Sequence, residues 1–355
     1  MTTDGKMGKP PVFRKELNIR NLYRLMEKNL LVSWYSAYQN LYSRRFLPRT
    51  ALISYPVYGV SLLGQIYGLM KLAKGRHAFL KASYDSNGKR SFRIRDTNSQ
   101  FHSIYFTRYA DGYEPDVAGA IDLFLKPGGV FMDIGSNWGH HSFKAVIDKQ
   151  AQAIIFEPNP TVFEDVVRIA KDLDVSSRIK AYNLALSDAE TEISLEQNYF
   201  ESGVASISPE FSKGPLASHR YLRLVKNLLK LPTMRYKVKV QPLDSFAFPR
   251  IDVIKIDAEG VELEILKGAS KTLGTCRPVI VFEYHSEDKT SYQGYSTLFS
   301  SLNYKLFQID CKKVGVDGNR YMYTIDEVKA LERDTQYNLI AAPVEFDWDA
   351  LNARQ

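Results

Sequence analysis

The feature that most constrains the fold is a regular alternation of short apolar runs and amphipathic stretches from Gly129 onward. The runs VFMDI, AIIFE, IDVIKID and RPVIVFE are almost continuously apolar, and stretches with helical periodicity separate them. YKLFQID and YNLIAAP are candidates for the last strands. This alternation predicts an α/β domain with a mostly parallel, doubly wound sheet and helices on both faces.

Acidic residues stand at the ends of four of the predicted strands. Ligands of open α/β sheets bind beyond the carboxyl ends of the strands, where the connecting loops gather. Acids at these ends would therefore lie along one edge of the sheet and face a common ligand. The four residues are Asp133, Glu157, Asp257 and Glu283.

The stretch GGVFMDIGSNWGHHS at 128–142 connects the first of these strands to a helix. A dinucleotide-binding turn needs the pattern G-x-G-x-x-G, so that the backbone can approach a pyrophosphate. Counting from Gly135, the second and third glycine positions hold Asn137 and His140. Asp133 would also repel a pyrophosphate. S-adenosylmethionine, which carries a cationic amino group and no phosphate, fits this turn better.

The next predicted strand ends in FEPN, which places Glu157 beside the turn. A carboxylate there can accept two hydrogen bonds from ribose hydroxyls, in NAD as well as in S-adenosylmethionine. Glu157 could instead cap the following helix, but Asn159 before Pro160 is the better cap. Together with the failed glycine pattern, the acid favours the methyl donor.

Six stretches of the sequence follow one another in the order DIGSNWGHHS, FEPNP, ALSD, VQPLDSF, DVIKIDAEGVELEILKGA and RPVIVFE. With these stretches in this order, the chain resembles the FkbM family of S-adenosylmethionine-dependent methyltransferases over about 114–285. The resemblance implies a class I methyltransferase-like (Rossmann-like) sheet. It also implies O-methylation of a hydroxyl on a glycan, a glycolipid or a secondary metabolite such as a polyketide. The candidate cofactor-binding residues are Asp133, Gly135, Asn137, Gly139, Glu157, Asn159, Ser187 and Asp188.

An alcohol must lose its proton when it is methylated, so a nearby base would help. Asp257 is the first candidate, because it ends a strand beside the expected position of the methyl group. Lys255 would keep it ionised but lower its basicity, and the two could also form a purely structural ion pair. Glu259 could act together with Asp257, or it could simply be an acidic residue in the first turn of the next helix. Glu283 ends the neighbouring strand.

His140 and His141 occupy the tyrosine positions of the family's GYYS stretch. At a helix N-terminus the dipole disfavours imidazolium, which leaves a neutral base, and His141 is the second candidate for that role. Both side chains could equally pack against the sheet. A Mg²⁺ or Mn²⁺ ion is possible but not favoured, because no tight motif supports it; its ligands would be Asp257, Glu259, Glu283 and His285.

Charge divides the chain into two parts. Residues 1–100 hold 18 Lys and Arg against 5 Asp and Glu, a balance of +13, and the remainder carries −6. The 21 residues at 50–70 are uncharged, and their composition favours a buried or interfacial helical hairpin over a membrane span. We therefore expect peripheral membrane contact or homo-oligomerisation through a basic helical region at 1–77.

A β-hairpin lead-in is predicted at 78–113, with a turn at Asn87-Gly88, before the methyltransferase domain at 114–355. The long connection at 199–234 is interpreted as a lid or substrate-binding insertion. With only Cys276 and Cys311 no disulfide framework is implied, and without an apolar leader a cytoplasmic location is expected, possibly at a membrane surface.

Two alternatives to the O-methyltransferase remain at this stage. The basic N-terminal part could serve an RNA methyltransferase, although the absence of an RRM-type signature makes a nucleic-acid partner unlikely. A non-catalytic scaffold that binds S-adenosylmethionine is the other alternative. The presence of Asp133, Glu157 and Asp257 together argues against such decay.

Overall fold

The computed structural model describes residues 2–3, 79–84, 90–95, 98–102, 113–197, 234–258, 260–285, 289–314, 320–328 and 336–352. Apart from β1 (Thr2–Thr3), the predicted basic region at 1–77 lies outside these residues, as does the insertion at 199–234 except for its last residue. The predictions of membrane contact and self-association therefore stay predictions. Across the part of the chain that the structure describes, no helix is both long enough and apolar enough to span a membrane.

The main sheet has nine strands in the order β1-β13-β12-β14-β11-β10-β4-β5-β6. Its central strands β11, β10, β4, β5 and β6 are parallel to one another, and β14, β12 and β13 extend it with antiparallel pairing. The strands are β4 (Val130–Ile134), β5 (Gln152–Phe156), β6 (Ile179–Tyr182), β10 (Val253–Ile256), β11 (Val279–His285), β12 (Tyr304–Val314), β13 (Arg320–Glu327) and β14 (Gln336–Pro343).

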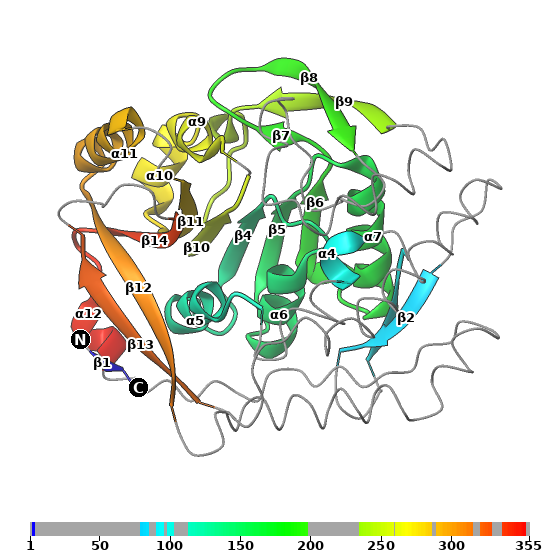
Figure 1. Cartoon of the computed structure of the whole chain (residues 1–355), viewed down its shortest axis with the longest axis horizontal. Coiled ribbons are helices and arrows are strands. Elements are labelled where there is room, and N and C mark those ends of the chain that lie inside the picture. The colour runs from blue at the N-terminus through cyan, green and yellow to red at the C-terminus, as the bar shows by residue number, and fades with distance from the viewer. Residues whose placement is uncertain are drawn as a thin grey trace, which may run out of the picture.

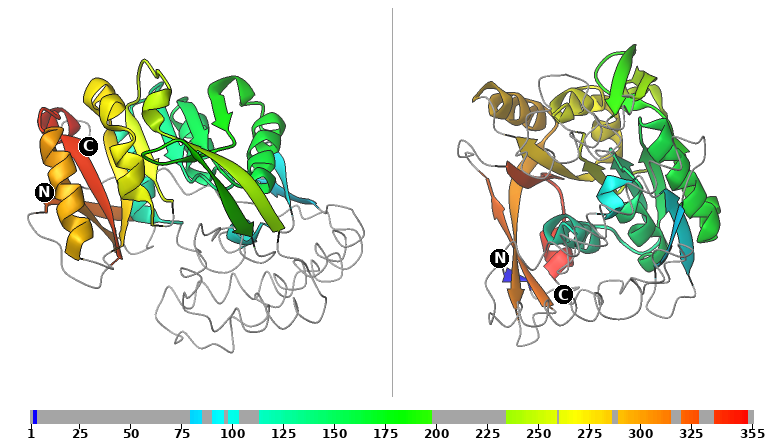
Figure 2. Two further views of the ribbon diagram at one scale, coloured as in Figure 1. Left: turned by 90° about the horizontal axis from the view of Figure 1, so that it is seen from above. Right: turned by 45° about the vertical axis from the view of Figure 1, so that its right-hand side comes forward.

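Helices cover both faces of this sheet, as the alternation predicts (Figures 1 and 2). One face packs on α9 (Glu262–Lys267), α10 (Ser270–Cys276) and α11 (Lys289–Ser301). The other packs on α5 (Pro115–Phe124), α6 (His140–Asp148) and α7 (Pro160–Asp172), and α12 (Trp348–Asn352) lies beside α5. Because both faces are buried, the parallel strands need apolar residues at successive positions. The mixed α/β, Rossmann-like fold class is confirmed.

Two smaller sheets flank the core. The strands β2 (Phe79–Ser83) and β3 (Ser91–Arg95) pair antiparallel, and the short helix α4 (Ser99–His102) follows them. The second small sheet has the order β7-β9-β8 and consists of β7 (Ala185–Leu186), β8 (Thr191–Gln197) and β9 (Met234–Gln241). The β2–β3 hairpin and the β12–β13 pair lie at opposite ends of the molecule in every view (Figures 1 and 2).

Some predicted elements are divided in the structure. The run IKAYNLALS forms β6 and then β7 in a different sheet, because the Asn183 amide turns back to donate hydrogen bonds to the main-chain oxygens of Glu157 and Pro158. The helix predicted over 260–273 is α9 followed by α10. Gly268 ends α9, where a β-carbon would lie 2.0 Å from the main-chain oxygen of Ser187. Asp244 then accepts hydrogen bonds from main-chain N–H groups in the first turn of α10.

Candidate functional site

The turn between β4 and α6 is built from three residues with positive φ: Gly135 at 72°, Asn137 at 51° and Gly139 at 84°. Asparagine tolerates this left-handed conformation better than most side chains do. The carboxylate of Glu157 accepts hydrogen bonds from the main-chain N–H groups of Asn137 and Asn159, both at 2.8 Å. Glu157 therefore ties the glycine turn to the loop after β5.

Burial dominates the chemistry of Glu157. The residue is only 6% exposed, and burial raises the pKa of its carboxyl to about 7, against the lowering effect of the two main-chain hydrogen bonds. Asn159, the predicted cap, does cap α7, because its side-chain oxygen accepts from the Thr161 N–H at 3.1 Å.

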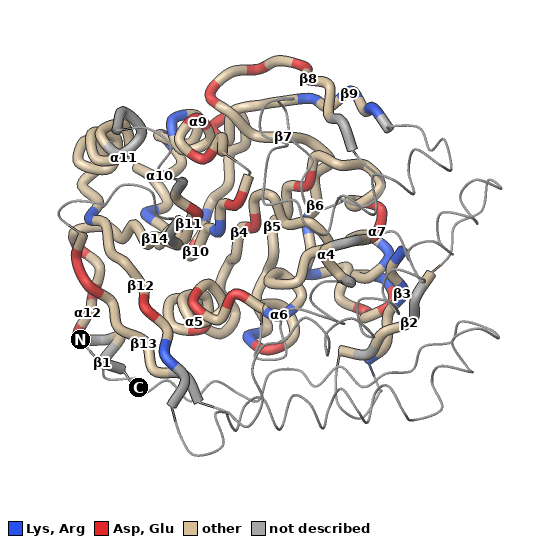
Figure 3. The backbone as a smooth tube through the Cα atoms, in the orientation of Figure 1, with Lys and Arg blue, Asp and Glu red and all other residues tan. Residues whose placement is uncertain are grey.

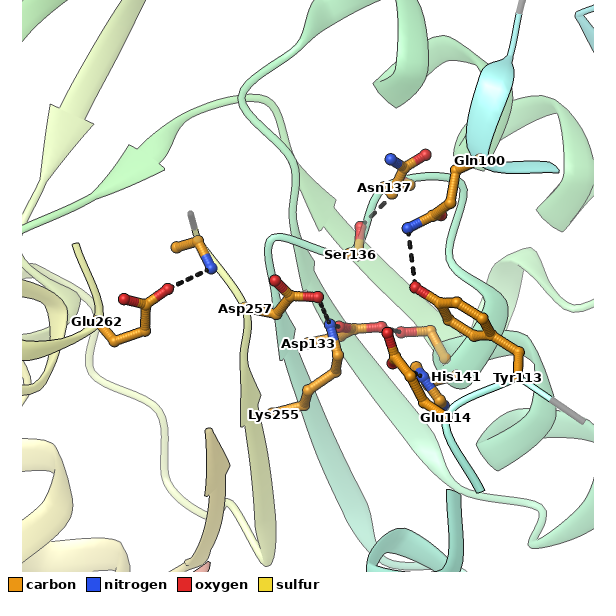
Figure 4. Close-up of polar contacts among 12 residues, drawn as sticks. Gln100, Tyr113, Glu114, Asp133, Ser136, Asn137, His141, Lys255, Asp257 and Glu262 are labelled. Atoms are coloured by element: carbon orange, nitrogen blue, oxygen red, sulfur yellow. Dashed lines mark hydrogen bonds and ion pairs between the residues drawn. The ribbon is translucent and has the colours of Figure 1, made fainter. Parts of the chain in front are cut away.

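Asp133 is 1% exposed and lies beside Lys255 of β10, its partner in the parallel register. Its Oδ2 accepts a hydrogen bond from Ser142 Oγ at 2.7 Å, and its Oδ1 is 3.8 Å from Lys255 Nζ. The same ammonium donates to Asp257 Oδ2 at 3.0 Å. Burial alone would lower the pKa of Lys255, but the charges of Asp257 and Asp133 outweigh it and raise that pKa. Lys255 thus bridges two carboxylates as a permanent cation (Figure 4).

Asp257 stands directly after β10, where its N–H donates to the Ile134 oxygen at 3.1 Å. Its own main-chain oxygen lies against Gly135, where a β-carbon would approach to 1.8 Å. The loop that follows is held by Glu262, whose Oε1 accepts from the Ala258 N–H (Figure 4) and also from the Gly260 N–H. Burial raises the pKa of the Asp257 carboxyl to about 6, although the Lys255 charge opposes this.

The two histidines have different surroundings. Burial lowers the pKa of His140 to about 3, so this ring is neutral, as predicted, although burial rather than the helix dipole is the main cause. His141 is 4% exposed, stacks on Tyr113 and places Nε2 3.0 Å from Glu114 Oε2. Tyr113 in turn accepts a hydrogen bond from Gln100 of α4 (Figure 4).

Glu114 is a site residue that the sequence analysis did not identify. It precedes α5 with φ 44°, a left-handed conformation that costs free energy outside glycine and often marks functional sites. Burial would raise the pKa of its carboxyl, but the hydrogen bond with His141 and nearby positive charge lower it to about 2. In the sequence an acid before Pro115 is indistinguishable from an ordinary helix cap, so no signal could have found it.

A cavity of about 510 Å³ opens beyond β10 and β11. Of the predicted catalytic residues, Asp257 and Glu283 line it, together with Glu114, which contacts His141. Glu259 and the side chain of His285 lie outside the described residues. Within the described ranges, no group of three or more His, Cys, Asp or Glu side chains is arranged to hold a metal ion.

Ser187 and Asp188 are placed apart from this cluster. The Ser187 N–H donates to the Gln241 oxygen of β9, and Gly268 packs on the backbone of both residues. Their hydroxyl and carboxylate contact each other at 3.3 Å. Their assignment to the cofactor stays a prediction, whereas the other six proposed cofactor residues gather around the turn.

Known proteins share this domain. The family model described as the methyltransferase FkbM domain matches residues 132–306. The hexuronic acid methyltransferase AglP of Haloferax volcanii is 28% identical over 197 residues, which are 55% of this chain and 72% of that protein. The 2-O-methyltransferase NoeI of Sinorhizobium fredii is 24% identical over 192 residues, 52% of this chain and 73% of that protein.

Among solved structures, a methyltransferase FkbM from Methylobacillus flagellatus KT superposes with a TM-score of 0.35 at 14% identity. The match covers 64% of this chain and 52% of that one, so this chain spans about half the length of the solved protein. The sequence motifs, the parallel sheet and the family match agree with one another. Over residues 132–306 this chain is a methyltransferase domain of the FkbM family.

Proposed function

We propose that this protein transfers a methyl group from S-adenosylmethionine to a hydroxyl of a glycan, glycolipid or secondary metabolite. The observation that carries the proposal is the position of Asp257. Its main-chain oxygen packs on the glycine turn, and its side chain lines the cavity beyond β10. A cofactor in the turn and an acceptor in the cavity would therefore meet at this one residue.

The turn offers polar atoms that fit such a cofactor. Asp133 Oδ1, His141 Nδ1 and Asn159 Nδ2 are buried and have no hydrogen-bond partner in the described part of the molecule. Buried polar atoms are rarely left unpaired, so they favour a bound ligand with matching groups. Asp133 would accept from the amino group, and Glu157, which retains free lone pairs, would accept from ribose hydroxyls.

S-adenosylmethionine, when bound, supplies an activated methyl group on a cationic sulfur. The chain has to hold an acceptor oxygen in line with that group and exclude water, which is mainly a matter of positioning. Asp257 would take the proton of the acceptor hydroxyl, and its pKa of about 6 leaves it mostly ionised at neutral pH. Lys255 would hold the Asp257 carboxylate in place, while Glu262 holds its loop.

The names of both relatives support this proposal, since one specifies a hexuronic acid and the other a 2-O position. The RNA alternative gains no support from the site, because the cavity lining carries five carboxylates that would repel a phosphate backbone.

The test has two steps. Calorimetric titration with S-adenosylmethionine and, separately, with NAD should show binding of the first and not the second. Transfer of a radiolabelled methyl group to a set of neutral oligosaccharides should then give alkali-stable ether products. Binding of NAD alone would reject the cofactor assignment. Binding of S-adenosylmethionine with transfer only to RNA would reject the acceptor class.

A further inference from the structure

The cavity beyond β10 and β11 has an unusual balance of charge. The charged side chains of its described lining are one cation, Lys255, and five carboxylates. These carboxylates come from the start of α5, from the strand ends and from β12, and Figure 3 shows the acidic positions of α5 and β12 near one another. The five residues are Glu114, Asp116, Asp257, Glu283 and Asp310.

The hydrogen-bond donors of the lining are engaged with these acids. Lys255 lies between Asp257 and Asp133, so these two carboxylates already offset its positive charge. The Asn338 amide donates to Asp116 at 2.7 Å. The Gln308 amide donates to Asp310 at 3.4 Å. The described lining therefore presents mainly acceptor oxygens to whatever enters.

Apolar residues also line the cavity, and Val117, Val281 and Ile309 among them belong to one core cluster beneath α5. A sugar ring has C–H faces that suit such apolar residues, and its hydroxyls are donors that suit the carboxylates around it. A carboxylate on the sugar would instead approach several like charges in a partly desolvated site, with no available cation among the described lining residues.

We infer that the acceptor is a neutral or amino-bearing sugar unit and that this cavity excludes uronic acids. The inference rests on the proposed function and sharpens its substrate class. It separates this chain from the relative AglP, whose name specifies a hexuronic acid. Asp310 is the residue best suited to test it, because it lines the cavity from β12 and has no place in the proposed proton transfer.

The experiment uses the full chain saturated with S-adenosylhomocysteine and three matched probes. These are methyl β-glucoside, methyl β-glucosaminide and methyl β-glucuronide, each titrated by ligand-observed NMR. We expect the first two to bind on the order of tenfold more tightly than the glucuronide at low salt, with the difference shrinking as salt rises. Asp310→Asn should reduce this difference in affinity between the glucuronide and the other two probes severalfold. Asp174→Asn removes the same charge from the exposed loop between α7 and β6, outside the cavity lining, and should leave the difference in affinity unchanged.

Three outcomes would overturn the inference: equal or tighter binding of the glucuronide, an unchanged ratio in Asp310→Asn, or binding of none of the probes. A separate calorimetric titration with S-adenosylmethionine distinguishes these from failure of the proposed function. If the cofactor does not bind, the function itself is wrong. If it binds while the sugar ranking fails, only the charge selection is wrong.

Discussion

The main-chain oxygen of Asp257 lies so close to Gly135 that a β-carbon on Gly135 would be 1.8 Å from it. Two neighbouring parallel strands, β4 and β10, thus end in loops that touch without an intervening side chain. This contact couples the predicted cofactor turn to the loop that carries the predicted base. Its consequence can be tested by adding a single methyl group.

We expect Gly135→Ala to reduce stability and to weaken S-adenosylmethionine binding strongly. Gly128→Ala is the matched control, because Gly128 has nearly the same φ (73° against 72°) but no atom within 4 Å of the new β-carbon. Both variants incur the left-handed penalty of roughly 1–2 kcal/mol. Only Gly135→Ala adds overpacking of about 1–3 kcal/mol. Thermal unfolding and calorimetry measure both effects; equal losses in the two variants would show that the contact is unimportant.

Cofactor affinity should depend on pH through Glu157. Burial holds the pKa of this carboxyl at about 7, so in the free protein it is largely neutral below that pH. The ionised Glu157 carboxylate is the better acceptor for the ribose hydroxyls. The affinity for S-adenosylmethionine should therefore rise with pH by up to about tenfold per pH unit below 7 and level off above pH 7.

Titration between pH 5.5 and 8.5 measures this dependence, which Glu157→Gln should flatten. Asp257→Asn is the control, because Asp257 also titrates near this range, and this variant should retain the rise. A flat profile in the wild-type protein would contradict the assignment of Glu157 to the ribose.

The sequence predicted the central sheet well because each buried parallel strand needs a continuous apolar run, and such runs are visible without contacts. The placement of Asp133, Glu157 and Asp257 near one another could be predicted because strand ends share one edge. The placement of Glu114 and Asp310 could not be predicted, because it depends on α5 meeting β11, β14 and β12 on one face of the sheet. That meeting is a tertiary relationship, and no local pattern encodes it.

Stability should depend much more on Arg95 than on its neighbour Arg93, although both pair with α7. Arg95 is 5% exposed and lies 3.5 Å from buried Asp165, whereas the Arg93 side chain is 58% exposed beside Asp172. Removing one partner of a buried pair costs about 3–5 kcal/mol, and an exposed pair contributes roughly 0–1 kcal/mol. Denaturant unfolding of Arg95→Ala and Arg93→Ala tests this; similar midpoints would mean that the hairpin hardly contributes to the core.

Divalent cations should not be required. The proposed chemistry needs only a base and a bound methyl donor, so it assigns no step to a metal ion. Methyl transfer after dialysis against EDTA should therefore match the untreated rate within error. Loss of activity that Mg²⁺ or Mn²⁺ restores would instead assign the carboxylates near Asp257 to a metal.

The decisive substitution is Asp257→Asn, which keeps the shape of the side chain but removes the base. Turnover should fall by about 10²–10⁴-fold, the usual contribution of general base catalysis, while affinity for S-adenosylmethionine changes little. In the wild-type protein kcat/KM should rise with pH through about 6, because the pKa of Asp257 is raised to that value and only the ionised form accepts a proton. Glu283→Gln, on the neighbouring strand of the same cavity, removes a negative charge that helps to raise the pKa of Asp257, so this variant should keep the rise in kcat/KM but move it to lower pH. If Asp257→Asn keeps nearly full turnover, the Lys255–Asp257 pair is structural and the proton goes elsewhere, with His141 the next residue to test.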